Sequence, residues 1–411
     1  MVNNLISKKT LFIFLFLSNA AFAEIDEIKL GKNMGYPECL ELIYSEQCKV
    51  GSFTKPEVFP YLSKVQPSKN IVKLERYPNP PIIKIGGAIG SGTDIEKYLA
   101  KQRATGLMIL KDGKVVVEKY QYDRTEDSRF RSFSMAKTIT SLLVGIAIDK
   151  GFIDSIDDKA EKYVPEIQGT VYGEATVRNL LRMSSGANFN EDYKSGESDL
   201  AKFYDNLVFK SLQHNAIYFN KRVFPQGKKF KYSTADTEVL VRILAKATKR
   251  NLTDLTQDWL WDPIGAENAA YWILLRSDNL ENGGGGFFAT IKDYAKIGNL
   301  LANDGFLNNI QMVPKQYLLD ATDSDLQPSG FKKNQAAYNF FGYGYQIWIL
   351  PFKERTFVLQ GIYGQNIFVQ PSSKVVMVQT SVYEKPAEDP NWNSQLELFK
   401  AAVRIFGGNP S

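Results

Sequence analysis

Histidine and cysteine are scarce in this chain of 411 residues, which has one histidine and two cysteines. A Ser-His-Asp triad needs a histidine as its base, so His214 would have to serve. It lies in the stretch Leu-Gln-His-Asn, where we expect a structural role instead. A structural zinc site usually takes four ligands, and Cys39 and Cys48 with one histidine fall short of that number. The sequence therefore disfavours both a histidine-based triad and a zinc site.

Motifs of several other enzyme classes are also missing. The chain has no G-x-S-x-G elbow, no phosphate-binding P-loop and no dinucleotide-binding G-x-G-x-x-G. Its formal net charge is only +5 and both signs are interspersed, whereas nucleic-acid-binding domains carry clustered basic residues. We therefore expect no nucleic-acid partner.

A long apolar run stands at the N-terminus, and no later run is long enough for a membrane-spanning helix. Lys8 and Lys9 precede the apolar residues 11–17, and Ala21-Phe-Ala23 offers small residues at both positions that determine cleavage. This order predicts a signal peptide over residues 1–23, with a membrane anchor as the alternative. We expect an exported protein, periplasmic or secreted, that has no transmembrane segment in its mature chain.

The two cysteines fall within the region that follows. Export would place Cys39 and Cys48 in an oxidising compartment, where a local disulfide between them is favoured. The region contains prolines at 78, 80 and 81, a cluster that cannot continue a regular helix or a central strand. We interpret residues 24–92 as an N-terminal extension that packs on the surface of a main domain spanning residues 93–411.

Hydrophobic patterns in the main domain predict strands at both ends with helices between them. Lys111-Asp-Gly-Lys114 separates two apolar runs and predicts a β-hairpin. This order predicts an α+β (α/β) fold, in which an antiparallel sheet is split by a helical insertion at about residues 152–300. The expected helices are 94–103 with Thr93 as N-cap, 134–150, 240–248, 291–301 and 392–406, and the expected strands are 106–110, 115–120, 343–350, 356–359, 366–369 and 375–380.

The pattern Ser134-Met-Ala-Lys137 opens the helix predicted over residues 134–150. The serine and the lysine are three residues apart, so they lie on one helix face. Because Ser134 begins the helix, its backbone N–H has no intrahelical partner and can donate to a developing oxyanion. Burial of Lys137 would lower its pKa and favour the neutral amine that a base requires. The same pattern occurs at Ser52 and Ser329, but only Ser134 begins a long apolar helix.

Further segments accompany this pattern in a fixed order. They are Phe130-Arg-Ser-Phe-Ser-Met-Ala-Lys137, Thr176-Val-Arg-Asn-Leu-Leu-Arg-Met-Ser-Ser-Gly186, Phe230-Lys-Tyr-Ser-Thr234, Gly283-Gly-Gly-Gly-Phe-Phe-Ala-Thr-Ile-Lys-Asp-Tyr-Ala295 and Gly361-Ile-Tyr-Gly-Gln365. Together they resemble the serine β-lactamase-related family, which includes class C β-lactamases, penicillin-binding proteins, related esterases and 6-aminohexanoate-dimer (nylon-oligomer) hydrolases. The resemblance is greatest to the nylon-oligomer hydrolase branch, because of the Met-Ser-Ser-Gly and Gly-Ile-Tyr-Gly-Gln stretches.

The resemblance implies a β-lactamase/transpeptidase-like fold, in which an antiparallel sheet flanked by helices lies beside an all-helical region. It implies Ser134 as the nucleophile, with Lys137 and Tyr232 as its proton-handling partners. In this family pattern Tyr232 would act as general base and acid, and Lys137 would lower its pKa. A phenol ordinarily titrates near ~10, so a neighbouring cation must stabilise a phenolate. The backbone N–H groups of Ser134 and Ile362 would then form the oxyanion hole.

The same resemblance suggests where a substrate would bind. Tyr193 lies in a loop whose tyrosine closes over the substrate in nylon-oligomer hydrolases, with a plain surface loop as the alternative. Gly361, Tyr363 and Gly364 stand where penicillin-recognising members have a K-T-G strand, and small glycines would let a substrate approach closely. The alternative for this stretch is a glycine-flanked turn.

Two departures from the family pattern concern specificity. Thr234 stands two residues after Tyr232, where Asn or Ser is usual, and this puts the substrate contact made there in doubt. No K-T-G occurs in the chain, so the lysine that holds a β-lactam's carboxylate is missing. β-Lactam recognition is therefore in doubt.

These observations favour hydrolysis of a small-molecule ester or amide through an acyl-enzyme on Ser134. No metal or organic cofactor is implied. A peptidoglycan D-peptidase of the penicillin-binding-protein type or a β-lactamase is the second hypothesis. A non-catalytic binding protein on the same fold is the third.

Overall fold

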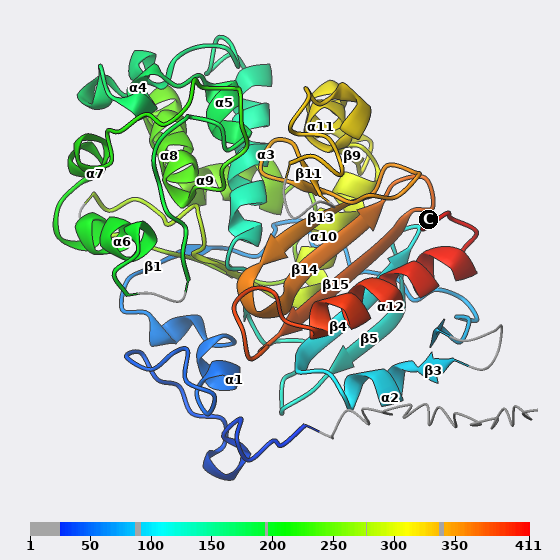
Figure 1. The fold of residues 1–411 in the computed structure, drawn as a ribbon. Coiled ribbons are helices and arrows are strands. Elements are labelled where there is room, and N and C mark those ends of the chain that lie inside the picture. Colours follow the sequence, from blue (N-terminus) through cyan, green and yellow to red (C-terminus); the bar gives the residue numbers. More distant parts are fainter. Residues whose placement is uncertain (1–24, 87–91, 194–195, 277, 337–340) are drawn as a thin grey trace, which may run out of the picture.

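The structure is a computed structural model that describes residues 25–86, 92–193, 196–276, 278–336 and 341–411 (Figure 1). The signal peptide predicted for residues 1–23 lies outside these described residues. Within the described ranges, the helices are all too short or too polar to cross a membrane.

The largest sheet is antiparallel and has seven strands in the order β11-β12-β13-β14-β15-β4-β5. The hairpin predicted at residues 111–114 joins β4 and β5, and Asp112 (φ 51°) and Gly113 (φ 73°) take the left-handed conformations that its two-residue turn requires. Because β15 pairs with β4, the two ends of the main domain meet inside this sheet. Its strands are β4 (Ala104–Lys111), β5 (Lys114–Tyr120), β11 (Gly342–Tyr343), β12 (Trp348–Ile349), β13 (Phe357–Gly361), β14 (Gln365–Gln370) and β15 (Val375–Ser381).

Both faces of this sheet are covered by helices. Side chains along each strand alternate between the two faces, so one strand contributes to two cores. Met108 and Leu110 of β4 belong to the core shared with α10 (Ile291–Ala302). Leu107 and Ile109 belong to a second core, which includes residues of α2 (Ile95–Leu99) and α12 (Asn391–Ile405). Figure 1 shows α12 lying across the sheet on this second side. The predicted α+β fold is confirmed.

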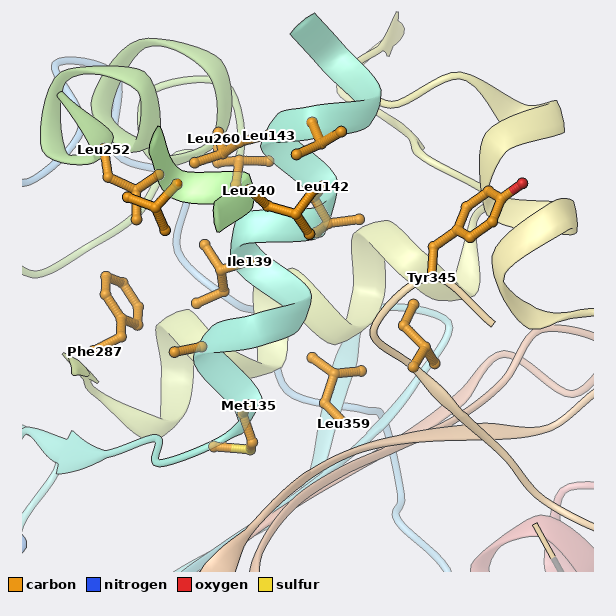
Figure 2. Packing of buried hydrophobic residues seen from close by; sticks show 14 of the residues in the cluster. Met135, Ile139, Leu142, Leu143, Leu240, Leu252, Leu260, Phe287, Tyr345 and Leu359 are labelled. Carbon is orange, nitrogen blue, oxygen red and sulfur yellow. The ribbon is translucent and has the colours of Figure 1, made fainter. Parts of the chain in front are cut away.

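Helix α3 (Met135–Asp149) runs through the centre of the molecule. It is apolar on nearly all sides and almost wholly buried, as its sequence predicted. Figure 2 shows Ile139, Leu142 and Leu143 of α3 in the same buried cluster as Leu240, which lies on a neighbouring helix. Truncating a leucine buried in this way costs about 2–5 kcal/mol, so the position of Ser134 at the start of α3 is firmly fixed.

Most regular elements between residues 152 and 300, the range of the predicted helical insertion, are helices, but two strands also occur there. β7 (Ala270–Ile273) and β8 (Phe287–Ala289) lie in a second sheet of order β1-β7-β8-β6, with β1 (Leu62–Val65) from the N-terminal region and β6 (Phe130–Arg131) just before Ser134. The helices here are α4 (Val171–Glu174), α5 (Val177–Leu181), α6 (Asp199–Phe209), α7 (Leu212–Tyr218), α8 (Thr234–Thr248) and α9 (Leu252–Thr256), followed by a π-helix (Gln257–Trp261).

Several element boundaries differ from prediction. The helix expected at residues 94–103 already ends at Leu99, and the helix expected at residues 240–248 begins earlier, at Thr234. The strand expected at residues 343–350 is a short hairpin of β11 and β12, because Gln346 between them is left-handed (φ 59°) and its side-chain carbonyl accepts a hydrogen bond from the Thr237 hydroxyl (2.8 Å). The N-cap of α2 is Asp94 and not Thr93, since the Asp94 carboxylate accepts the N–H of Lys97 (2.8 Å).

The N-terminal region carries the predicted disulfide between Cys39 and Cys48, whose Cα atoms are 5.8 Å apart. Its chain runs along the domain surface and enters the second sheet through β1. The other short elements are η1 (Lys32–Met34), α1 (Lys49–Ser52), η2 (Pro56–Val58), β2 (Lys84–Ile85), β3 (Thr93–Asp94), η3 (Ala160–Lys162), η4 (Pro165–Ile167), β9 (Phe306–Leu307), β10 (Ile310–Gln311), α11 (Lys315–Thr322), η6 (Ser324–Leu326) and η7 (Ile362–Gly364).

Candidate active site

Ser134 is the N-cap of α3 and follows a residue with an unusual backbone. Phe133 has a φ of 44°, a conformation that bulky side chains rarely adopt and that often marks functional sites. Gly361, at the end of β13, packs directly on this turn, because a Cβ added to it would lie 2.3 Å from the carbonyl oxygen of Ser132. The two segments predicted to supply the oxyanion-binding N–H groups are therefore in contact.

Lys137 lies one helical turn below Ser134. Its Nζ donates to Ser134 Oγ (3.1 Å) and to the carbonyl oxygen of Gly284 (2.6 Å), and the residue is only 2% exposed. Burial lowers the pKa of Lys137 from 10.5 to about 8, although the carboxylates of Glu191 and Glu238 act in the opposite direction. The amine can therefore exist in its neutral form near neutral pH, as a base next to a serine hydroxyl requires.

Tyr232 lies beside the lysine, immediately before α8. The centre of its ring is 5.3 Å from Lys137 Nζ, and the ring stacks on Trp348 with a centroid distance of 5.5 Å. Ser233, the next residue, caps α8 by accepting the N–H of Asp236. Ser134, Lys137 and Tyr232 are thus brought together from two helix starts that are far apart in sequence.

Glu191 organises the rim of the site, a role that sequence reasoning missed. Its carboxylate accepts hydrogen bonds from the backbone N–H of Thr234 (2.8 Å), from the Thr234 hydroxyl and from the Tyr193 hydroxyl (3.1 Å). The unusual threonine after Tyr232 therefore has an internal partner. The only signal in the sequence was the polar composition of the Asn190-Glu-Asp-Tyr193 loop.

A second carboxylate supports Lys137 from the side of the glycine run. Glu238 is fully buried; it accepts the N–H of Gly284 (2.8 Å) and pairs with Arg242 (2.6 Å). Gly284 in turn accepts a hydrogen bond from Lys137. The Gly283–Gly286 run was recognised as a motif from the sequence, but its contact with the lysine was not.

A cavity of about 920 Å³ opens at Ser134. Its wall near the nucleophile includes most of the residues predicted to contact substrate. Tyr363 is an exception, because its ring is buried against Phe53 and Phe133, which favours a structural role. The predicted residues on the wall are Ser134, Tyr193, Tyr232, Gly361, Ile362 and Gly364, and its aromatic residues farther out include Phe230, Phe341, Trp348 and Trp392.

His214 takes no part in this arrangement. It lies on α7, where its Nε2 is 3.1 Å from Lys210 Nζ and its ring stacks on Tyr218. The competing Ser52-x-x-Lys55 pattern is structural, since the Ser52 hydroxyl donates to the carbonyl oxygen of Cys39. In the described ranges, His, Cys, Asp and Glu side chains form no group of three or more suited to hold a metal.

Comparison with known proteins identifies the fold and the family of this chain. A 6-aminohexanoate-dimer hydrolase from Paenarthrobacter ureafaciens is 24% identical over 319 residues, which cover 75% of this chain and 80% of the relative. A Bacillus anthracis structure with a provisional assignment as a 6-aminohexanoate-dimer hydrolase has a TM-score of 0.76 at 21% identity, covering 89% of this chain and 95% of its own. A family VIII carboxylesterase structure has a TM-score of 0.58 at 17% identity, covering 74% of this chain and 93% of its own. The Beta-lactamase family model matches residues 93–399, and the chain belongs to this family.

Proposed function

We propose that this protein is a serine hydrolase that cleaves carboxylic ester or amide bonds through an acyl-enzyme on Ser134. One observation supports the proposal above all. A buried lysine whose pKa is lowered to about 8 donates a 3.1 Å hydrogen bond to a serine at the start of a helix, inside a large cavity. A serine hydroxyl needs an adjacent base to become a nucleophile, and Lys137 is in place to be that base.

The reaction would run in two halves. Ser134 Oγ attacks the carbonyl carbon while its proton passes to neutral Lys137, with Tyr232 relaying it toward the leaving group. The negative charge on the carbonyl oxygen would be held by the backbone N–H groups of Ser134 and Ile362. When the alcohol or amine leaves, it takes the proton. Water then attacks the acyl-enzyme and gives a proton to the same base. The base returns that proton to Ser134 Oγ as the acid is released.

The wall of the cavity favours uncharged substrates with a sizeable apolar group. Tyr232 stacks on Trp348, and Trp348, Phe341 and Trp392 follow one another with ring centroids 5.9 Å and 5.5 Å apart. Aromatic faces of this kind bind apolar and aromatic groups. The Glu191 carboxylate lies at the same rim, where it would repel a substrate carboxylate.

The test is a hydrolysis screen with matched variants. p-Nitrophenyl esters, 6-aminohexanoate dimer, D-aminopeptides and a chromogenic cephalosporin are offered to the wild type and to Ser134→Ala, Lys137→Ala and Tyr232→Phe. Ser134→Ala should lose about a million-fold in turnover, and a double Lys137/Tyr232 variant should be little worse than either single one, because the residues act as a unit. A wild type that neither turns over a substrate nor binds a fluorophosphonate covalently would favour the non-catalytic hypothesis.

We also propose that the protein is exported, with residues 24–92 as an extension of the hydrolase domain. The Cys39–Cys48 disulfide supports this, because such bonds persist in oxidising compartments. N-terminal sequencing of the protein recovered from the periplasm or medium should begin at Glu24. A chain that stays in the cytoplasm with its first 23 residues attached would contradict the proposal.

A further inference from the structure

The segment Cys39–Phe59, here called the N-terminal clamp, lies outside the residues that match the family model. Its disulfide closes a loop in which Cys48 is fully buried and caps α1. The Ser52 hydroxyl bridges the loop, accepting from the N–H of Cys39 (2.9 Å) and donating to its carbonyl oxygen (3.2 Å). The clamp is therefore cross-linked twice. Figure 1 shows α1, in blue, below the end of the large sheet.

Phe53 of the clamp packs against both segments predicted to form the oxyanion hole. Its ring lies 4.8 Å from that of Phe133 and 5.4 Å from that of Tyr363, and those two rings are 5.8 Å apart. Its carbonyl oxygen also accepts the N–H of Arg131 (2.8 Å). One clamp residue thus contacts the neighbours of both proposed oxyanion donors.

Those neighbours have strained backbones. Phe133, which precedes Ser134, has a φ of 44°, and Tyr363, which follows Ile362, has a φ of 61°. Bulky residues keep such conformations only when the surrounding structure holds them. The orientation of a peptide N–H depends on these angles, so what holds Phe133 and Tyr363 also aims the adjacent donors.

Two other clamp residues support the Tyr363 ring. Lys49 Nζ lies 4.7 Å from the centre of the Tyr363 ring and donates to the carbonyl oxygens of Tyr383 and Glu384, both at 3.0 Å. Tyr44 stacks on Tyr363 with its centroid at 5.7 Å. These contacts hold the Tyr363 ring in place.

The Phe133 side is held through a buried charge. The Arg131 guanidinium lies between the rings of Phe59 and Phe133, at 4.8 Å and 4.4 Å. Its Nε and Nη1 find no hydrogen-bond partner within the part of the chain that the structure describes. The guanidinium is therefore held in part by two aromatic faces, of which Phe59 belongs to the clamp.

We infer that the N-terminal clamp is a positioning element for the oxyanion hole, acting on Ser134 and Ile362 through Phe133 and Tyr363. The inference rests on the proposed function. It assigns the disulfide-bonded extension a part in catalysis, with no contact to substrate. Oxyanion donors act only in the transition state, so loosening them should lower kcat and leave KM nearly unchanged.

The experiment compares Tyr44→Ala with Tyr61→Ala. Tyr44 and Tyr61 are 49% and 48% exposed, so neither change should unfold the protein, and Tyr61 serves as the matched control. Phe53→Leu is the stronger variant. Each is assayed with a p-nitrophenyl ester for kcat and KM, and with a trifluoromethyl ketone, which forms a tetrahedral oxyanion on the nucleophile, for Ki. Thermal melts check folding.

We expect Phe53→Leu to lower kcat about tenfold or more and Tyr44→Ala by a smaller factor. KM should stay within about twofold, and Ki for the ketone should rise by the factor that kcat/KM falls. Tyr61→Ala should match the wild type. Reduction of the folded wild type with a phosphine should lower kcat, and reoxidation should restore it.

Two results distinguish a failure of the positioning role from a failure of the proposed function. If the wild type hydrolyses esters but Tyr44→Ala keeps both kcat and Ki, or if Tyr61→Ala is equally impaired, the positioning role is wrong while the proposed function stands. If the wild type neither hydrolyses an ester nor binds a fluorophosphonate, both fall. Should Phe53→Leu not fold, Tyr44→Ala and the reduction experiment decide the matter.

Discussion

The pKa of Lys137 leads to a quantitative prediction for activity against pH. Burial lowers it from 10.5 to about 8, which amounts to about 3 kcal/mol against the charged amine relative to water. At pH 7 about one molecule in ten would then hold a neutral lysine, compared with about one in three thousand at the ordinary pKa. The site thus gains a base at neutral pH through burial.

The sign of the pH dependence follows from this assignment. If the reactive form has Lys137 neutral, kcat/KM for a p-nitrophenyl ester should rise with pH and reach half its plateau near pH 8. The measurement is a profile from pH 6 to 10 in buffers of constant ionic strength, corrected for spontaneous hydrolysis. Far-ultraviolet circular dichroism at each pH checks that the fold persists.

A single substitution tests whether Lys137 causes the rise of kcat/KM with pH, here called the rising limb. The Glu191 carboxylate raises the pKa of Lys137, so Glu191→Gln should move the rising limb to lower pH. Glutamine keeps a carbonyl that can accept the N–H of Thr234, which makes it the matched variant. A flat profile, or a limb centred near pH 6.5 that disappears in His214→Asn, would refute the assignment of Lys137 as the base.

Three further predictions concern other parts of the molecule. His214→Asn should leave kcat/KM within about tenfold of the wild type, whereas loss of a triad base would cost about a million-fold; thermal melts control for folding. Intact mass should rise by two hydrogens on reduction of Cys39–Cys48, with about 2–3 kcal/mol of stability lost; two free thiols in the native protein would contradict this. Short p-nitrophenyl esters should be hydrolysed more efficiently than a cephalosporin, by about one or two decades, because a charge-assisted bond to the carboxylate is missing; the reverse ranking would overturn it.

Much of the fold followed from local patterns. The all-round apolar composition of residues 134–150 predicted a buried helix, and Asp-Gly between β-rich runs predicted the β4–β5 hairpin. The strand expected at 343–350 was wrong because its break depends on Gln346, whose side chain bonds Thr237 of a distant helix. A contact of that kind leaves no periodic signal in a single sequence.

Some residues of the candidate site were predicted and others were missed, because only contacts between residues close along the chain leave a local signal. Ser134 and Lys137 are three residues apart on one helix, so spacing alone placed them together, and the family pattern added Tyr232. Glu191 and Glu238 were missed because they approach Lys137 from a loop and a helix far along the chain. Tyr363 was expected at the substrate because its stretch stands where relatives have the K-T-G strand, yet its backbone is left-handed and its ring packs against Phe53 and Phe133.

The two missed carboxylates explain why Lys137 is suited to a proton cycle. Burial without them would lower the pKa of Lys137 further, because both Glu191 and Glu238 raise it. A lysine that is too weak a base could accept the serine proton only poorly, and a strong base would release it too slowly to the leaving group. Burial and the two carboxylates oppose each other, and together they set the pKa of Lys137 at about 8. Glu191→Gln should therefore change the pH profile more than the KM for an uncharged ester.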